Sequence, residues 1–178
     1  GEIYHCDIFE KLKKFKNKKI LIIGVSDTGA DIAELLKDNN KVFLSTKNGI
    51  WFQNRNSGAY APADMFYNRL IDFLIKNLTG KKYIHDIFGD THVSKWWGKG
   101  GSGIDIWQPK TDYLNSYYVK SRDIINSIAK GQITPKNAVK NISGNVIFFE
   151  DGSNEDIDTI LFCTGYKPNH CLSFLNEK

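Results

Sequence analysis

The stretch KKILIIGVSDTGADIAELLKD, residues 18–38, decides the fold of this chain. It opens with a continuous apolar run, Ile20 to Ile23, which is typical of a strand covered on both faces in a parallel sheet. Small and polar residues follow, and apolar side chains then recur at helical spacing. A helix is therefore expected to begin near Asp27 or Thr28 and to end near Asn39.

A second apolar strand, KVFLST at residues 41–46, follows this helix after a short turn. Two parallel strands joined by one helix form a βαβ unit, which crosses over right-handed in nearly all proteins. The chain therefore contains one half-unit of a Rossmann-like α/β fold.

The remaining sequence predicts further elements around this unit. Apolar spacing predicts helices over residues 64–78 and 114–129, the second ending at Gly131 in the C′ position. Residues 80–110, with the segment WWGKGGSGIDIW, are expected to form a long loop. Turn dipeptides at Ser143-Gly144 and Asp151-Gly152 predict an antiparallel meander from residue 132 to 150, and DTILFCT, residues 158–164, predicts another buried strand. The expected class is α/β, a parallel sheet plus an antiparallel meander.

Composition excludes several other classes. The 178 residues, 41% of them hydrophobic, suit one soluble domain, and without a spanning run or a signal peptide a cytoplasmic location is expected. The cysteines Cys6, Cys163 and Cys171 lack CxxC spacing, and the four histidines form no ligand pattern, so neither a disulfide framework nor a metal site is expected. A net charge of +4 without a basic stripe or a nucleic-acid motif predicts no nucleic acid partner.

The turn between the first strand and the helix reads Gly24-Val25-Ser26-Asp27-Thr28-Gly29, the G-x-G-x-x-G register of dinucleotide-binding proteins with Ser26 in place of the middle glycine. The first glycine permits the tight turn, the last lets helix and strand pack closely, and the helix N-terminus attracts a pyrophosphate. We predict that these residues bind a dinucleotide. The alternative is a tight βα turn of another α/β protein, in which Asp27 serves only as a helix cap.

The residues after the second strand discriminate between the two nicotinamide cofactors. NAD enzymes place a carboxylate there for the ribose 2′-hydroxyl, whereas this chain has Ser45, Thr46 and Lys47. Hydroxyl and ammonium groups suit a 2′-phosphate, which a carboxylate would repel. NADP is therefore favoured over NAD, and the alternative for Lys47 is an ordinary solvated lysine.

Several motifs together resemble the flavin-containing monooxygenase family. FKNKKILIIGVSDTGADIA, residues 15–33, is similar to the family's F-x-G-K-x-V-x-V-I-G-x-G-x-S-G-x-D-I-A, with Asn17 and Ser26 each replacing a glycine. VFLSTKNGIWFQNR, residues 42–55, resembles V-F-L-S-T-R-x-G-x-W-x-x-N-R, with Lys47 in place of arginine. DTILFCTGY, residues 158–166, looks like the late D-x-V-I-F-A-T-G-Y motif, and residues 1–9 match part of the signature F-x-G-x-x-x-H-x-x-x-(Y/F).

The resemblance implies a flavoprotein plan with two dinucleotide-binding domains, in which an NADP domain lies within an FAD domain. Residues 1–178 would be the NADP domain, with 1–16 and 165–178 as crossover segments and Thr164, Gly165 and Tyr166 at the passage between the two domains. The full enzyme would use NADPH, FAD and O₂ to oxygenate nucleophilic nitrogen or sulfur of small molecules, as in N,N-dimethylaniline monooxygenase activity. The fragment alone, without its FAD domain, is expected to be inactive.

Other interpretations stay open at this point. The chain could be the NADP domain of a Baeyer–Villiger or N-hydroxylating enzyme, or of a disulfide reductase, which would need a redox cysteine pair. It could also be a stand-alone dinucleotide-binding module whose loop carrying Trp96, Trp97 and Trp107 contacts a partner protein. His5 is as well suited to a structural hydrogen bond as to a cofactor contact, and Asn54 and Arg55 fit either role.

Overall fold

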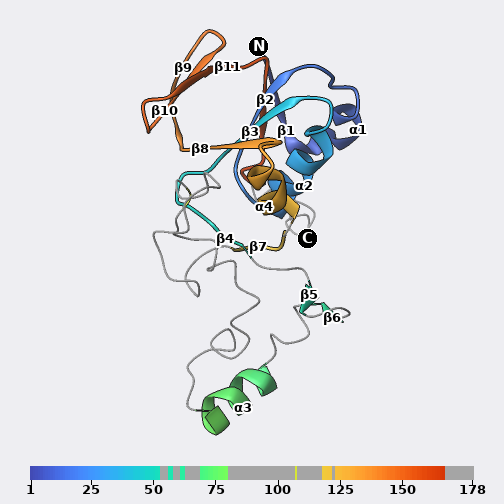
Figure 1. The fold of residues 1–178 in the computed structure, drawn as a ribbon, viewed down its shortest axis with the longest axis vertical. Coiled ribbons are helices and arrows are strands. Elements are labelled where there is room, and N and C mark those ends of the chain that lie inside the picture. Colours follow the sequence, from blue (N-terminus) through green and yellow to red (C-terminus); the bar gives the residue numbers. More distant parts are fainter. Residues whose placement is uncertain are drawn as a thin grey trace, which may run out of the picture.

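A five-stranded parallel sheet forms the centre of the structure, a computed structural model that describes residues 1–52, 56–57, 61–62, 69–79, 107, 118–121 and 123–166. The strand order is β1-β12-β2-β3-β8. The strands are β1 (Glu2–His5), β12 (Thr159–Phe162), β2 (Lys19–Ile23), β3 (Lys41–Ser45) and β8 (Ile133–Lys136). Every neighbouring pair is parallel, and Figure 1 shows the sheet edge-on with helices packed beside it.

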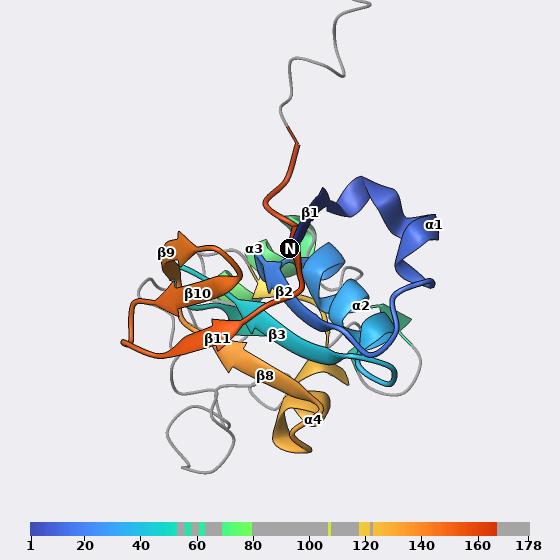
Figure 2. The same ribbon diagram turned by 90° about the horizontal axis from the view of Figure 1, so that it is seen from above.

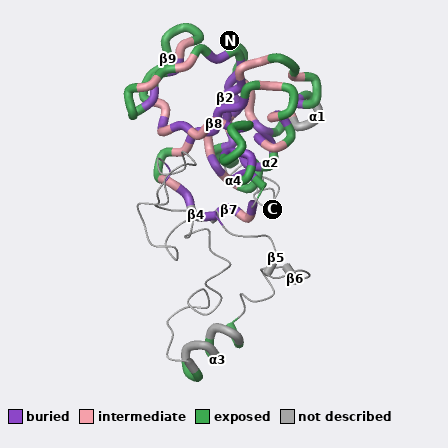
Figure 3. Tube along the Cα trace, viewed as in Figure 1, coloured by how far each residue is buried: buried purple, intermediate pink, exposed green. Residues whose placement is uncertain are grey.

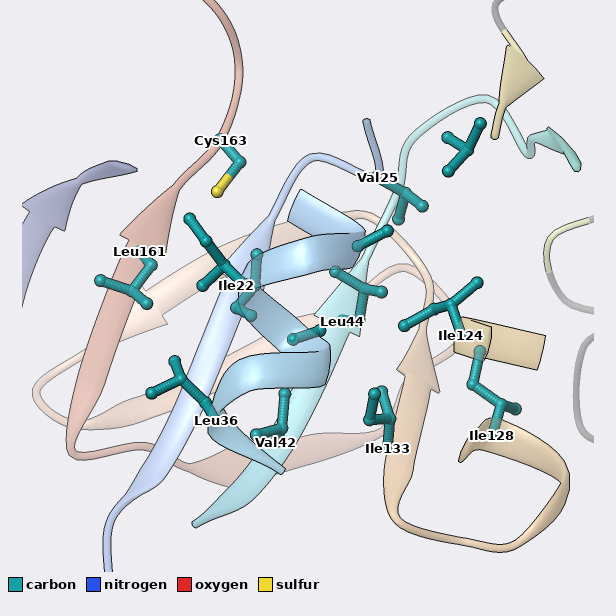
Figure 4. Close-up of a cluster of buried hydrophobic side chains, with 14 of the residues drawn as sticks. Ile22, Val25, Leu36, Val42, Leu44, Ile124, Ile128, Ile133, Leu161 and Cys163 are labelled. Atoms are coloured by element: carbon teal, nitrogen blue, oxygen red, sulfur yellow. The ribbon is translucent and has the colours of Figure 1, made fainter. Parts of the chain in front are cut away.

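Two helices, α2 (Asp27–Leu36) and α4 (Asp123–Ala129), cover one face of this sheet. The side chains between helices and sheet form the larger core cluster, part of which Figure 4 draws. Ile20, Ile22 and Leu44 from the strands are fully buried there against Ile32 and Leu36 of α2. This apolar contact is the main force that holds the βαβ unit together.

An antiparallel sheet covers the opposite face, in the order β11-β10-β9, with strands β9 (Val139–Ser143), β10 (Val146–Phe149) and β11 (Asn154–Asp156). Figure 2 shows it on the side of the parallel sheet away from α2. Leu21 and Phe43 of the parallel sheet pack against Ile147 and Phe149 of β10. Buried residues accordingly concentrate along the central strands in Figure 3, whereas the hairpin around β9 is largely exposed.

The predicted strand–turn–helix–strand unit is confirmed as β2, α2 and β3, and the predicted strand at residues 158–164 as β12. The helix ends at Leu36, earlier than the Asn39 expected from sequence. At this end the Nδ2 of Asn40 donates to the carbonyls of Leu36 and Phe15 at 3.1 and 3.0 Å, so the last carbonyl of the helix bonds to the following turn rather than to a further helical residue.

The helix predicted over residues 114–129 is confirmed over Asp123–Ala129, as α4. Tyr118–Val119 is instead a short strand, β7, that pairs in parallel with β4 (Trp51–Phe52), while 114–117 and 122 lie outside the described residues. The predicted C′ glycine is confirmed: Gly131 has φ +73°, its N–H donates to Ile128, and the next N–H donates to Ser127. Those two bonds form a Schellman motif, which ends α4.

The meander predicted from residue 132 onward begins later than expected. Residues 133–136 form β8, which pairs in parallel with β3 at the edge of the central sheet. Both predicted turn glycines, Gly144 and Gly152, have positive φ and connect the antiparallel strands. Sequence shows that a short strand exists but does not show which of two sheets it joins.

The segment predicted to be a crossover, residues 1–16, contributes structure of its own: β1, the 3-10 helix η1 (Cys6–Ile8) and α1 (Phe9–Leu12). Leu12 is fully buried in the larger core cluster. Asn17, which replaces a family glycine, has φ +56°, a left-handed conformation that asparagine tolerates better than most residues. The crossover role itself stays a prediction, and residues 167–178 lie outside the described part.

The segment between β4 and β7 is described only in pieces, namely β5 (Asn56–Ser57), β6 (Ala61–Pro62), α3 (Arg69–Thr79) and Trp107. Helix α3 confirms part of the helix expected over 64–78, and residues 64–68 lie outside the described part. The same is true of Trp96, Trp97, Asn54 and Arg55. None of the helices in the described ranges has the length and apolar character that a bilayer crossing requires.

Candidate functional site

Three parallel strands end side by side at one edge of the central sheet. In the register of the sheet, Ile23 at the end of β2 pairs with Ser45 of β3 on one side and with Phe162 of β12 on the other. From β2 the chain continues to β3, its neighbour on one side, whereas the neighbour of β2 on the other side is β12, which comes much later in the sequence. The strand order therefore reverses beside β2, and ligands of open α/β sheets bind at such a point, outside the carboxyl ends of the strands.

The two glycines of the turn have the roles that the sequence predicted. Gly24 has φ +105°, and a Cβ there would lie 2.6 Å from the carbonyl oxygen of Cys163. A Cβ on Gly29 would collide with the carbonyl oxygen of Gly24. Any larger residue would force the turn away from β12 or the helix away from the turn, so both positions require glycine.

Ser26 caps helix α2. Its backbone is extended (φ −118°, ψ 179°), and its Oγ accepts a hydrogen bond from the N–H of Gly29 at 3.2 Å. A non-glycine residue adopts this conformation without strain, which explains why the middle glycine of the motif is dispensable here. The serine hydroxyl, however, occupies one of the free N–H groups that would otherwise face a phosphate.

Asp27 is the first residue of α2, and its carboxylate is directed to the backbone. Its Oδ1 accepts a hydrogen bond from the N–H of Lys120 at 2.8 Å, which ties the turn to the segment after β7. A carboxylate beside a pyrophosphate would repel it, and this hydrogen bond gives the charge a partner elsewhere. Thr28, the next residue, is exposed at the start of the helix.

The residues at the end of β3 and just after it differ in their exposure. Ser45 is only 1% exposed, and its Oγ donates to the carbonyl of Asn137 at 2.6 Å. Thr46 is half-buried, with its N–H donating to the carbonyl of Lys136 at 3.4 Å, and Lys47 is exposed. Lys47 is thus exposed and Thr46 partly so, whereas the Ser45 hydroxyl is engaged by Asn137.

The third strand end carries Thr164, Gly165 and Tyr166, all exposed, beside the start of the chain. His5 Nε2 lies 3.2 Å from the carbonyl oxygen of Gly165, and the His5 and Tyr166 rings meet edge-on with centroids 4.9 Å apart. Tyr166 Oη lies 3.5 Å from the sulfur of Cys6, and this hydrogen bond raises the pKa of Tyr166. His5 thus joins the two predicted crossover segments.

Sequence reasoning missed some residues that shape this edge. Trp107 was grouped with exposed tryptophans of a partner-binding loop, but it is fully buried. Its ring stacks near Phe52 at 6.2 Å and its Nε1 donates to the carbonyl of Lys136 at 2.8 Å, so it supports the end of β8. Its position after a glycine-rich stretch gave no signal of burial. The described residues contain no group of three or more His, Cys, Asp or Glu that could hold a metal ion.

Comparison with known proteins gives a consistent family. The model of the family described as flavin-binding monooxygenase-like matches residues 1–178. Dimethylaniline monooxygenase [N-oxide-forming] 2 of Mus musculus is 30% identical over 179 residues, covering 99% of this chain and 32% of the relative. Flavin-containing monooxygenase 5 of Oryctolagus cuniculus is 30% identical over 168 residues, covering 93% of this chain and 31% of the relative. The chain thus spans about a third of the length of these relatives.

Solved structures share the fold. A cyclohexanone-bound cyclohexanone monooxygenase in its rotated conformation superposes with a TM-score of 0.66 at 10% identity, covering 97% of this chain and 45% of that one. An oxidised steroid monooxygenase bound to NADP superposes with a TM-score of 0.62 at 11% identity, covering 93% and 42%. The expected class, a two-dinucleotide-domain flavoprotein fold with a parallel sheet and an antiparallel sheet, is confirmed.

Proposed function

Because this chain belongs to the flavin-binding monooxygenase-like family, we propose that it is the NADPH-binding part of a longer monooxygenase and that the cofactor binds at the carboxyl edge of β12, β2 and β3. The observation that carries the proposal is the turn after β2, where Gly24 and Gly29 leave no room for a side chain beside the N-terminus of α2. A closely packed turn at a ten-residue helix suits a pyrophosphate, which accepts hydrogen bonds from free N–H groups.

The residues present fit this cofactor. The exposed Thr28 and the backbone of the turn would receive the pyrophosphate, while the carboxylate of Asp27 is held by the N–H of Lys120. Thr46 and Lys47 would receive the 2′-phosphate through a hydroxyl and an ammonium group. In this proposal Ser45 anchors that segment to Asn137 and contacts a ligand only if its hydroxyl rotates.

The predicted specificity for NADPH over NADH depends on a single exposed point charge. Lys47 replaces the arginine of the family motif, and an ammonium group cannot form the bidentate contact that a guanidinium forms with a phosphate. We therefore expect weaker NADPH binding than an arginine would give, with NADH bound more weakly still. The steroid monooxygenase of the same fold was solved with NADP bound, which supports this choice of cofactor.

The longer enzyme would combine this part with an FAD domain and transfer one oxygen atom from O₂ to nucleophilic nitrogen or sulfur of small molecules. The flavin supplies that chemistry when it is bound. The contribution of this chain would be to bind NADPH, to orient its nicotinamide toward the second domain and, through the segments around His5 and Tyr166, to join the two domains. The names of the dimethylaniline monooxygenase relatives support this activity.

Isothermal titration calorimetry on the 178-residue chain tests the proposal. NADPH should bind more tightly than NADH, and Lys47→Ala should weaken NADPH binding roughly tenfold while leaving NADH unchanged, since one charge-assisted hydrogen bond is lost. Lys140→Ala, at an exposed lysine of β9, is the matched control and should change neither affinity. Oxygen consumption with NADPH should stay at background. Equal or tighter binding of NADH would overturn the assignment.

A further inference from the structure

Two cysteines far apart in sequence meet at the joint between β1 and β12. The register of these parallel strands ends with His5 opposite Phe162, so the next residues, Cys6 at the start of η1 and Cys163, directly follow two adjacent strand ends. Both side chains belong to the larger core cluster and are 6% and 4% exposed. Figure 4 shows Cys163 at the end of β12, on the same side of the sheet as Leu161.

The spacing suits a covalent link. Neighbouring strands of a sheet lie about 4.7–4.9 Å apart, and the Cα atoms of a disulfide are usually about 4.4–6.8 Å apart. Both thiols are free in this structure. Burial raises the pKa of the Cys163 thiol to about 12, and the neighbouring Cys6 adds to the increase.

The two thiols differ in their surroundings. Cys163 lies among apolar side chains, whereas Cys6 Sγ lies 3.5 Å from Tyr166 Oη and 3.9 Å from His5 Nδ1. The other ring nitrogen, His5 Nε2, faces the carbonyl oxygen of Gly165 at 3.2 Å. Because a carbonyl only accepts hydrogen bonds, this contact favours the tautomer with the proton on Nε2, so that Nδ1, which also lies 3.7 Å from Asp7 Oδ1, can accept a proton from Cys6.

We propose that Cys6 and Cys163 are a redox-responsive pair that hydrogen peroxide converts into a disulfide. The Cys6 sulfur attacks one peroxide oxygen, the O–O bond breaks, and a sulfenic acid and one water form. The Cys163 sulfur then attacks the Cys6 sulfur, the S–O bond breaks, and the hydroxyl leaves as a second water with the Cys163 proton. Two thiols and one peroxide thus give one disulfide and two waters.

The disulfide would lock the strand pairing beside the turn after β2. A Cβ on Gly24 would collide with the carbonyl oxygen of Cys163. The N–H of Cys163 donates to the carbonyl of Ile23 at 2.8 Å. The segment entering through β1 and the segment leaving through β12 would become covalently joined at this point. This inference concerns the thiols alone and holds whichever ligand the turn receives.

The experiment uses the 178-residue chain with Cys171→Ser, so that only the proposed pair remains. After treatment with hydrogen peroxide, alkylation of free thiols and digestion, mass spectrometry should find the peptides of Cys6 and Cys163 linked, and dithiothreitol should release them. In the chain with all three cysteines the same linkage should dominate. Thiols that stay free, that become sulfinic acid without a link, or that pair mainly with Cys171 overturn the proposal.

Single variants test the order of the steps. Cys163→Ala, which restores the residue usual at this position in the family motif, should accumulate a dimedone-reactive sulfenic acid on Cys6 and form no intramolecular disulfide. Cys6→Ser should leave Cys163 almost unlabelled, and strong labelling there contradicts the order. His5→Asn should slow disulfide formation by at least about tenfold, since the base is lost. An unchanged rate in a variant with an unchanged circular dichroism spectrum excludes His5 as that base.

Discussion

The turn after β2 and the end of β3 lie side by side, yet the residues at each are constrained in different ways. In the turn, the backbone itself decides which residues fit: Gly24 and Gly29 are required because a Cβ would collide with neighbouring carbonyl groups. At the end of β3 the residues differ instead in how far each side chain is exposed. Ser45 points into the protein, whereas Lys47 is exposed.

The alternation of side chains along β3 explains why Ser45, its last residue, is buried. Side chains on one face recur at every second residue, so Ser45 lies on the same face as Phe43, which is buried under the antiparallel sheet. The hydroxyl accordingly finds a protein partner, Asn137. Lys47, two residues further on, is exposed because it lies beyond the end of β3, where the neighbouring strands no longer cover it.

The largest effect is expected at Gly24. Gly24→Ala should lower the free energy of unfolding by about 3 kcal/mol, because the new Cβ clashes with Cys163 and the positive φ disfavours alanine. Urea denaturation measures this loss. The matched control is Gly152→Ala, where φ is +83° but nothing lies within 4 Å of the added Cβ, and about 1 kcal/mol should be lost. Equal losses in the two variants would mean that close packing plays no part in the turn.

Ser45→Ala tests the other side of the comparison. It should lower the free energy of unfolding by about 1.5 kcal/mol, because the carbonyl of Asn137 loses its donor. The ratio of NADPH to NADH affinity should stay as in the unmodified chain, in contrast to Lys47→Ala. A lower NADPH affinity in Ser45→Ala at unchanged stability would show that the hydroxyl rotates to the ligand.

Ser26→Gly should sharpen the comparison within the turn. The substitution frees the N–H of Gly29 for a phosphate and restores the family glycine, so calorimetry should show NADPH bound about tenfold more tightly. Stability should fall by only a few tenths of a kcal/mol, since glycine is itself an acceptable N-cap. Ser26→Ala, which frees the same N–H but loses the cap, should cost about 1 kcal/mol of stability. Weaker NADPH binding in Ser26→Gly would mean that the hydroxyl itself contacts the ligand.

The smallest effect is expected outside the site, at Asn17, whose φ of +56° is positive like that of Gly24. Asn17→Ala should lower the free energy of unfolding by about 1 kcal/mol, and Asn17→Gly should leave it nearly unchanged. Thermal unfolding of the two variants side by side checks this. If alanine is tolerated as well as glycine, the left-handed conformation has no energetic importance.

Local chemistry made much of this fold predictable. The βαβ unit, the turn glycines and the Schellman motif at Gly131 each depend on residues close in sequence, and all were identified. Strand β1 was not predicted, because its residues are exposed or half-buried and do not alternate between buried and exposed positions. Strands β7 and β8 were assigned to the wrong element or sheet, because pairing partners distant in sequence decide where a short strand lies.

The candidate site likewise combines features that local motifs predict with contacts that they do not. The position of the turn and of the β3 segment followed from motifs, but the hydrogen bonds of Asp27 to Lys120 and of Ser45 to Asn137 depend on segments that arrive from elsewhere in the chain. The meeting of Cys6 and Cys163 depends on the pairing of β1 with β12 in the same way. No spacing within the sequence predicts contacts of this kind.

The parallel pairing of β1 with β12 also has a mechanical consequence. Tension applied before Glu2 and beyond Phe162 would pull the two strands lengthwise in opposite directions, so that all the hydrogen bonds between them would carry load at once. Such shear resists rupture better than the sequential opening of a hairpin. A single-molecule pulling experiment on this unit should therefore record one high force peak, and a low, gradual extension would show that the ends yield elsewhere first.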